Sequence, residues 1–189
     1  QNVSDAAKAD LKYIKKSKSG DIEKEYRLNS QDMAGLMVRV RGLHLEESNF
    51  RINGEPISAG LFDLSTCFYL TAKNLLEQGK TPKYYVPKCE HHLEARWWNN
   101  LFTRLEEKLS LPKSTLRATF LIETLPAAYQ IEEILYELKD HAAGLNVGRW
   151  DKIFSDIKVL KSHNNRLSPD RSTINMSKHW MENYAKRLV

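Results

Sequence analysis

The sequence contains only two cysteines among 189 residues, Cys67 and Cys89, and no CxxC motif. This scarcity argues against a disulfide framework and against a structural zinc site, and it is typical of a reducing compartment. No apolar stretch reaches the ~18 residues that a membrane span needs, so we expect a soluble protein with no membrane partner. Two nucleotide-binding motifs, GxGxxG after a strand and GxxxxGK[ST], are also missing from the chain.

The sequence has no long run of residues that carry the same charge. The net charge is +5 and the pI is near 9.1, yet 29 basic residues are interspersed with 24 acidic ones. A basic excess can indicate a nucleic-acid-binding module. The only dense basic run, residues 12–18, is followed directly by acidic residues, and no strand combines aromatic with basic positions. We therefore interpret the run as a solvated hairpin tip and expect no nucleic-acid partner.

The length of 189 residues allows one ordinary domain with its own core, but not two of full size. The chain begins without methionine and stops within a helical pattern, ENYAKRLV. We therefore expect a piece of a longer polypeptide, with the rest of that polypeptide as a partner.

The residue pattern predicts a β-hairpin followed by alternating strands and helices. In residues 9–29 two alternating runs flank a turn at residues 17–20, where Gly20 supplies the positive φ that such turns need. Strands are predicted at residues 34–42, 83–88, 114–124 and 143–148. Helices are predicted at residues 59–78, 90–109, 127–138 and 151–161. Ser58 can cap the first of these helices, and Gly79 can end it. Residues 44–56 are predicted to be turns, and a polar loop with Pro169 precedes a last amphipathic segment.

The helix at residues 90–109 has the strongest periodicity. Apolar residues recur there at every fourth position: Leu93, Trp97, Leu101, Leu105 and Leu109. We expect this stripe to face the core. Trp98 and Phe102 flank the stripe, and we interpret these aromatic residues as core rather than as a cofactor-binding box.

Strict alternation of strand and helix is typical of parallel βα units, and about four such units are present. A closed eight-stranded barrel takes about 250 residues. We therefore predict an α/β fold with a partial (β/α)₈ barrel at residues 31–189, preceded by a β-hairpin region at residues 1–30. An open, doubly wound sheet is the alternative.

Ligands of parallel α/β folds bind at the carboxyl ends of the strands. Glu123 and Asp151 lie at the carboxyl ends of two predicted strands, where an unpaired buried carboxylate is costly. Two carboxylates that leave positions open for water and substrate suit Mg²⁺, a hard cation with oxygen ligands. The alternative is that each acid merely lies near a helix start, where the helix dipole favours it.

Two further features lie at predicted strand ends. Arg39 shares one face of its strand with Arg41, where it could hold an anionic substrate or stabilise an oxyanion; a surface ion pair is the alternative. A strand-to-helix turn is formed by Gly148, Arg149, Trp150 and Asp151. Its backbone N–H groups, at a helix N-terminus, can bind a small carboxylate. The alternative is an ordinary turn capped by Asp151.

The remaining polar residues at strand ends carry weaker signals. His91 and His92 are adjacent, and this spacing does not place two ligands on one helix face, so we expect no zinc site there. Lys88 follows a strand and has the amine for a Schiff base, but the pattern favours a surface cation.

Five segments resemble malate synthases of the A type: VRVRGLHL, GLFDLSTCFYLTAKNLLEQG, YYVPKCEHHLEARWWNNLF, LRATFLIETLPAAYQIEEILYELKDHAAGLNVGRWDKIFSDIKVLK and SPDRSTINM. The resemblance extends from about Asn2 to the C-terminus. It implies a (β/α)₈ TIM barrel and an enzyme that condenses glyoxylate with acetyl-CoA and hydrolyses the product to malate and CoA, using Mg²⁺. It also implies a cytoplasmic protein, or a peroxisomal or glyoxysomal one in a eukaryote.

By position, the resemblance implies that Arg39 is the active-site arginine and that Glu123 and Asp151 are the magnesium ligands. It also implies that the backbone amides of the turn at residues 148–151 hold the glyoxylate carboxylate. The family's general base falls beyond Val189, so we name no base here and expect no turnover from residues 1–189 alone. Two alternatives stay open: a related Mg²⁺-dependent lyase of citryl-CoA or malyl-CoA, and an inactive structural piece.

Overall fold

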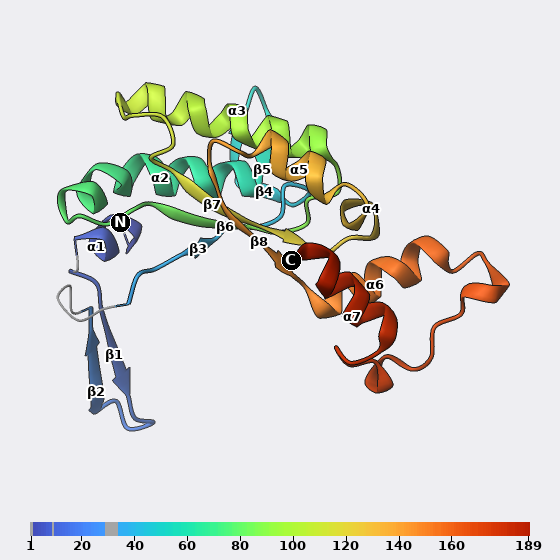
Figure 1. Ribbon diagram of the computed structural model, residues 1–189. Helices are drawn as coiled ribbons and strands as arrows, with labels where there is room; N and C mark the ends of the chain where they lie inside the picture. The colour runs from blue at the N-terminus through green and yellow to red at the C-terminus, as the bar shows by residue number, and fades with distance from the viewer. Residues whose placement is uncertain (1, 9, 29–33) are drawn as a thin grey trace.

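The computed structural model describes residues 2–8, 10–28 and 34–189, and a parallel sheet lies at the centre of these residues (Figure 1). Its strands are, in spatial order, β3 (Val38–Arg39), β6 (Lys83–Val86), β7 (Arg117–Ile122) and β8 (Ala142–Val147). Spatial order thus follows chain order, and every neighbouring pair is parallel. A doubly wound sheet reverses its order at a switch point, whereas a barrel does not. The predicted partial (β/α)₈ TIM barrel is therefore confirmed.

Helices cover one face of this sheet (Figure 1): α2 (Ala59–Glu77), α3 (His92–Leu109) and α5 (Ile131–Glu137). As predicted, the Ser58 side chain caps α2 by accepting a hydrogen bond from the N–H of Leu61, and Gly79 follows the helix with a φ of +69°. The predicted helix at residues 127–138 is divided, because a short α4 (Leu125–Ala128) precedes α5. The core lies between the sheet and these helices.

The buried face of α3 differs from the predicted stripe. Leu93 and Trp97 are 52% and 41% exposed. The buried residues of α3 are Ala95, Trp98, Phe102, Glu106 and Leu109. A strict spacing of four drifts by roughly 40° around the helix at each step, so the amino-terminal end of the predicted stripe is exposed, whereas Leu101, Leu105 and Leu109 pack in or against the core as predicted. Trp98 and Phe102 do pack in the core, as expected.

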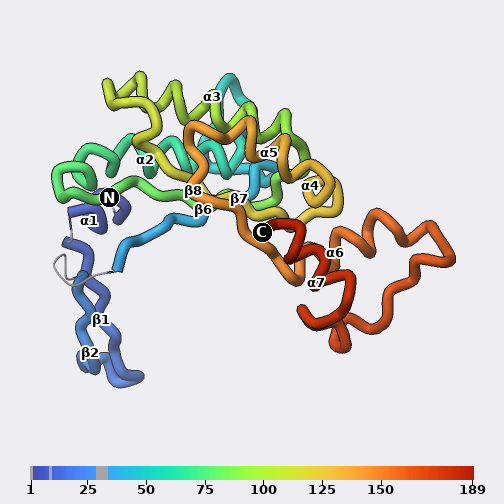
Figure 2. The backbone as a smooth tube through the Cα atoms, in the orientation of Figure 1, coloured from blue at the N-terminus to red at the C-terminus, as the bar shows by residue number. Residues whose placement is uncertain are grey.

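The N-terminal residues form a helix and a hairpin. The predicted hairpin is present as β1 (Lys12–Lys16) and β2 (Ile22–Arg27), with Gly20 at a φ of +93°. It projects away from the sheet and its helices (Figures 1 and 2). A preceding helix, α1 (Asn2–Ala7), was not predicted. The predicted boundary between residues 30 and 31 lies outside the described residues.

A second hairpin occupies the segment that was predicted to be turns. β4 (Glu46–Ile52) and β5 (Glu55–Ser58) pair around the Asn53-Gly54 turn. Nearly all of β4 is exposed. No apolar alternation therefore marks this strand in the sequence, although Asn-Gly is a strong hairpin signal.

The last part of the chain holds α6 (Arg149–Leu160) and α7 (His179–Leu188), which lie close to each other beside the end of β8 (Figure 1). Two 3₁₀ turns connect them, η1 (Asn164–Arg166) and η2 (Arg171–Thr173). Among the helices of the described residues, none has the length and apolarity to cross a membrane.

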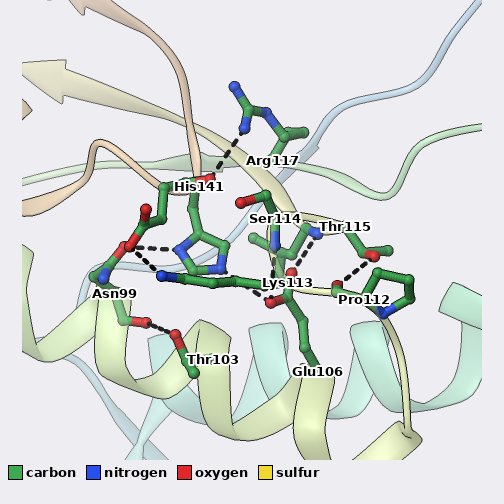
Figure 3. Close-up of polar contacts among 11 residues, drawn as sticks. Asn99, Thr103, Glu106, Pro112, Lys113, Ser114, Thr115, Arg117 and His141 are labelled. Atoms are coloured by element: carbon green, nitrogen blue, oxygen red, sulfur yellow. Dashed lines mark hydrogen bonds and ion pairs between the residues drawn. The ribbon is translucent and has the colours of Figure 1, made fainter.

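A buried polar network joins α3 to the amino ends of β7 and β8 (Figure 3). Glu106 is 1% exposed and accepts hydrogen bonds from the N–H groups of Leu116 (2.8 Å) and Ser114 (3.2 Å). Its Oε2 lies 3.1 Å from Nε2 of His141, whose Nδ1 lies 2.7 Å from Oδ1 of Asn99. Both acceptor atoms of this buried carboxylate thus have protein partners.

Candidate active site

The carboxyl ends of β7 and β8 bring Glu123 and Asp151 together. Ile122 ends β7 and is paired with Val147, which ends β8. Glu123 follows Ile122 directly, and Asp151 lies in the first turn of α6, after β8. The two carboxyl groups come within hydrogen-bonding range of each other. The convergence that the sequence predicted for these two acids is therefore present.

Glu123 is buried but only partly satisfied by the protein. Its side chain is 2% exposed, and Oε1 accepts a hydrogen bond from the N–H of Lys88 at 3.0 Å. Burial, together with the neighbouring carboxyl of Asp151, raises the pKa of Glu123 to about 7. A buried carboxylate that faces a second carboxylate favours either a proton or a cation.

Lys88 contacts both acids. It has a φ of +65°, in the left-handed region, and its Nζ lies 2.5 Å from Oδ1 of Asp151. Although burial alone raises the pKa of Asp151, hydrogen bonds from Lys88 and Glu123 and the charges of Lys88 and Arg39 hold it below its usual value. Lys88 is therefore a half-buried cation of this cluster rather than the surface cation that its sequence position favoured.

The two arginines that were expected to share a face are separated. Arg39 ends β3, its guanidinium lies 5.8 Å from the centre of the Tyr85 ring, and its charge acts on Asp151. Arg41 instead binds Asp63 (2.7 Å) and Glu47 (2.9 Å). The strand ends at Arg39, so its alternation does not continue to Arg41. The charge of Arg39 thus acts on Asp151, whereas Arg41 holds α2 and β4.

The turn at residues 148–151 opens α6 without a side-chain cap. Gly148, not Asp151, is the N-cap residue, and it has no side chain that could accept a hydrogen bond from the N–H groups of the first turn. A Cβ atom on Gly148 would lie 2.6 Å from both Cβ and Oε2 of Glu123, so only glycine fits here. The side chain of Arg149 turns away to donate to the carbonyl of Ile174. Trp150 is 54% exposed, and its ring packs 4.3 Å from the Arg149 guanidinium.

Tyr184 of α7 also reaches this site, although nothing in the sequence pointed to it. Its hydroxyl donates to the carbonyl of Ile122 and accepts from the N–H of Gly148 at 3.1 Å. The sequence pattern of α7 indicates only an amphipathic helix. A tyrosine on such a helix is ordinarily part of its packing face.

A pocket of about 480 Å³ adjoins Asp151 and Lys88. Its lining residues are Leu43, His44, Lys88, Glu90, Glu94, Thr124, Asp151, Phe154, Ser155 and Lys158. His91 and His92 do not line it: the ring of His91 caps α3, and Nδ1 of His92 lies 2.7 Å from Oε1 of Gln130. These two histidines thus have structural contacts.

The acid cluster fits a cation that needs few protein ligands. Among the residues described, no group of three or more histidine, cysteine, aspartate or glutamate side chains is placed to hold a metal. Glu123 and Asp151 offer two carboxylates, and Asp151 lines an open pocket. Mg²⁺ ordinarily keeps several waters and binds one or two carboxylates plus the substrate. The donor set therefore fits Mg²⁺ better than a metal that needs a full set of protein ligands.

Known proteins resemble this chain along its whole length. The glyoxysomal malate synthase of Candida tropicalis is 46% identical over 169 residues, which are 88% of this chain and 31% of that protein. The malate synthase of Myxococcus xanthus (strain DK1622) is 43% identical over 188 residues, and malate synthase A of Escherichia coli (strain K12) is 42% identical over 188 residues. Both alignments cover 100% of this chain and 34% of the relative. The chain thus spans about a third of the length of these curated relatives.

A family model agrees with these relatives. Residues 35–189 match the model described as "Malate synthase, TIM barrel domain". The match covers most of the chain, including the strands, the acids at their carboxyl ends and Arg39. The chain therefore belongs to the malate synthase family.

Proposed function

We propose that this chain carries the metal- and glyoxylate-binding part of a malate synthase, the enzyme that condenses glyoxylate with acetyl-CoA and hydrolyses the product to malate and CoA. The convergence of Glu123 and Asp151 beside Arg39, in a chain of this family, carries the proposal. The relatives include glyoxysomal and bacterial malate synthases. A cytoplasmic or glyoxysomal location is part of the proposal.

Glu123 and Asp151 would hold the Mg²⁺ ion. When bound, Mg²⁺ supplies Lewis-acid polarisation of the glyoxylate aldehyde. Lys88 contacts Asp151 in this structure, so its ammonium group would compete with a cation for this carboxylate. The N–H of Lys88 continues to hold Oε1 of Glu123 and fixes its orientation.

The first turn of α6 would hold the glyoxylate carboxylate. The first N–H groups of a helix lack partners within the helix, and the dipole at this end favours an anion. Gly148 provides no side chain that competes for these N–H groups. Backbone amides bind a carboxylate without carrying a net charge, which leaves the charge of Arg39 for another role.

Arg39 would stabilise the negative charge that develops on oxygen during carbon–carbon bond formation. A guanidinium is always charged near neutral pH and donates from a planar fork, so it is suited to an oxyanion. Its position over the Tyr85 ring limits its movement.

Metal binding tests the proposal directly. Titration of the purified protein with Mn²⁺, followed by the loss of the free-ion electron paramagnetic resonance signal, is expected to give one site per chain. Glu123→Ala and Asp151→Ala are each expected to weaken this site more than about 100-fold, because losing a direct ligand exceeds the usual 10–100-fold cost of an outer partner. Glu132→Ala, an exposed acid of α5, is the matched control.

The role of Arg39 requires a separate readout. Arg39→Ala is expected to leave the Mn²⁺ affinity within about threefold and to weaken glyoxylate binding to the metal-loaded protein about tenfold or more, since a charge-assisted hydrogen bond contributes 1.5–3 kcal/mol in a typical case. Equal Mn²⁺ binding by wild type and Glu123→Ala contradicts the metal site. Glyoxylate binding that is indifferent to Arg39→Ala contradicts the role of this arginine.

A further inference from the structure

We infer that Tyr184 is a positioning residue of this site, whose hydroxyl joins the ends of β7 and β8 and so fixes the spacing of Glu123 and Asp151. The inference rests on the proposed metal site and extends it to α7, a helix that carries no candidate ligand. It concerns the relative position of the two acids rather than the chemistry that they perform.

The hydroxyl joins two backbone groups that lie next to the acids in the chain. It donates to the carbonyl of Ile122, the residue directly before Glu123, and accepts from the N–H of Gly148 at 3.1 Å. Gly148 is the N-cap of the helix whose first turn contains Asp151. The Tyr184 hydroxyl oxygen therefore links the backbone next to Glu123 with the backbone that begins the helix of Asp151.

This link begins where the strand pairing ends. The paired register of β7 and β8 ends at Ile122 and Val147. Buried backbone groups need hydrogen-bond partners. Without the hydroxyl, the carbonyl of Ile122 and the N–H of Gly148 each lose the partner that Tyr184 provides, and the two strand ends are free to separate.

Movement of the turn is transmitted directly to Glu123. A Cβ on Gly148 would lie 2.6 Å from atoms of Glu123, which means that the Gly148 backbone and this side chain are already in contact. A shift of a few tenths of an ångström at Gly148 therefore changes the place that Glu123 occupies. Metal ligands tolerate only small departures from their distances.

The surroundings of Tyr184 keep its ring and its proton in place. The residue is 6% exposed, and its neighbour Met181 is fully buried. The Lys152 ammonium lies 5.1 Å from the ring and pairs with Asp156 at 2.5 Å. Burial raises the pKa of Tyr184 to about 12, so the hydroxyl keeps its hydrogen near neutral pH and can donate to Ile122.

The contacts of the hydroxyl define a positioning role. Its hydrogen is directed to one backbone group and one lone pair accepts from another. This phenol therefore acts through the backbone of the site. Loss of such an outer partner typically costs 10–100-fold in metal affinity.

The test is Tyr184→Phe, which removes the hydroxyl and keeps the ring. In the purified protein, the Mn²⁺ affinity is expected to fall about tenfold. Hydrogen exchange of the Gly148 amide, followed by nuclear magnetic resonance without metal, is expected to become faster because the amide loses its acceptor. Tyr136→Phe, at a 65% exposed position, is the matched control and is expected to change neither quantity.

A second variant separates positioning from general packing. Met181→Ala creates a cavity under α7 but keeps the Tyr184 hydroxyl. It is expected to lower the melting temperature more than Tyr184→Phe does and to leave the Mn²⁺ affinity within about threefold of wild type.

The Mn²⁺ affinities of the wild type and the two variants distinguish failure of the positioning role from failure of the metal site. Equal Mn²⁺ affinity in wild type and Tyr184→Phe overturns the positioning role while the metal site stands. An equal loss of affinity in Met181→Ala reduces Tyr184 to a packing residue and also overturns the inference. Absence of Mn²⁺ binding by the wild-type protein overturns the proposed metal site, and the inference that rests on it.

Discussion

Two buried glutamates lie at opposite ends of the same pair of strands, and their surroundings differ. Glu106, at the amino ends of β7 and β8, receives two backbone N–H groups and faces His141 (Figure 3). Glu123, at the carboxyl ends, receives one backbone N–H group and faces a second carboxyl group, that of Asp151. The two residues are 1% and 2% exposed, so burial does not distinguish them.

The partners of each acid therefore decide its role. Glu106 has a protein partner on each oxygen, and such a carboxylate stabilises the fold. Glu123 faces the carboxyl group of Asp151, and this pairing is unfavourable when both groups are charged. A divalent ion bound by both carboxylates would remove the repulsion between them. This division agrees with the general rule that the amino end of a barrel serves stability and the carboxyl end serves function.

The largest expected effect is on the structural acid. Glu106→Ala leaves the N–H groups of Ser114 and Leu116 and the ring of His141 without their shared acceptor. We expect the free energy of unfolding to fall by about 2–5 kcal/mol, because each N–H group left without its buried acceptor costs about 1–3 kcal/mol. Urea denaturation measures this loss, and Glu107→Ala, at the exposed neighbouring position, is the control. A loss below about 1 kcal/mol would remove the distinction between the two acids.

The next effect is the pH dependence that Glu123 gives to the free energy of unfolding. Its pKa is about 7 in the folded protein and 4.5 ordinarily. Between these values the folded state keeps a proton that the unfolded state releases, so the free energy of unfolding of the metal-free protein decreases as pH rises from about 4.5 to 7. Urea denaturation of wild type and Glu123→Gln at several pH values isolates this contribution. We expect the decrease to be smaller in the variant, and identical pH profiles would contradict the raised pKa.

The smallest expected effect comes from Lys88. Its side chain and that of Asp151 are 32% and 37% exposed, so solvent screens their ion pair. We expect Lys88→Met to change the stability of the metal-free protein by less than about 1 kcal/mol. The same change removes a cation that competes for Asp151, so the Mn²⁺ affinity is expected to rise severalfold. Lys158→Met, in the same pocket, is the control, and a weaker Mn²⁺ site in Lys88→Met would assign Lys88 to metal binding rather than to competition.

Local sequence signals located most of the elements that carry the site. The alternation of strands and helices predicted the parallel βα units, and the acids after two of the strands were identified by their position alone. Ser58, Gly20 and Gly79 marked a helix start, a hairpin turn and a helix end correctly, because capping and positive φ depend on a few neighbouring residues. The β4–β5 hairpin was missed because β4 is nearly all exposed and lacks an apolar pattern.

The sequence by itself determined the fold class, the family and the chemical character of the strand ends, since hydrophobic periodicity and residue type are local properties. Tertiary structure alone decided which polar groups meet. It separated Arg41 from Arg39, placed the Lys88 ammonium on Asp151, and brought the Tyr184 hydroxyl between Ile122 and Gly148. These contacts join residues far apart in the chain, and no local pattern encodes the distance between two such side chains. That distance follows from the packing of whole elements against one another.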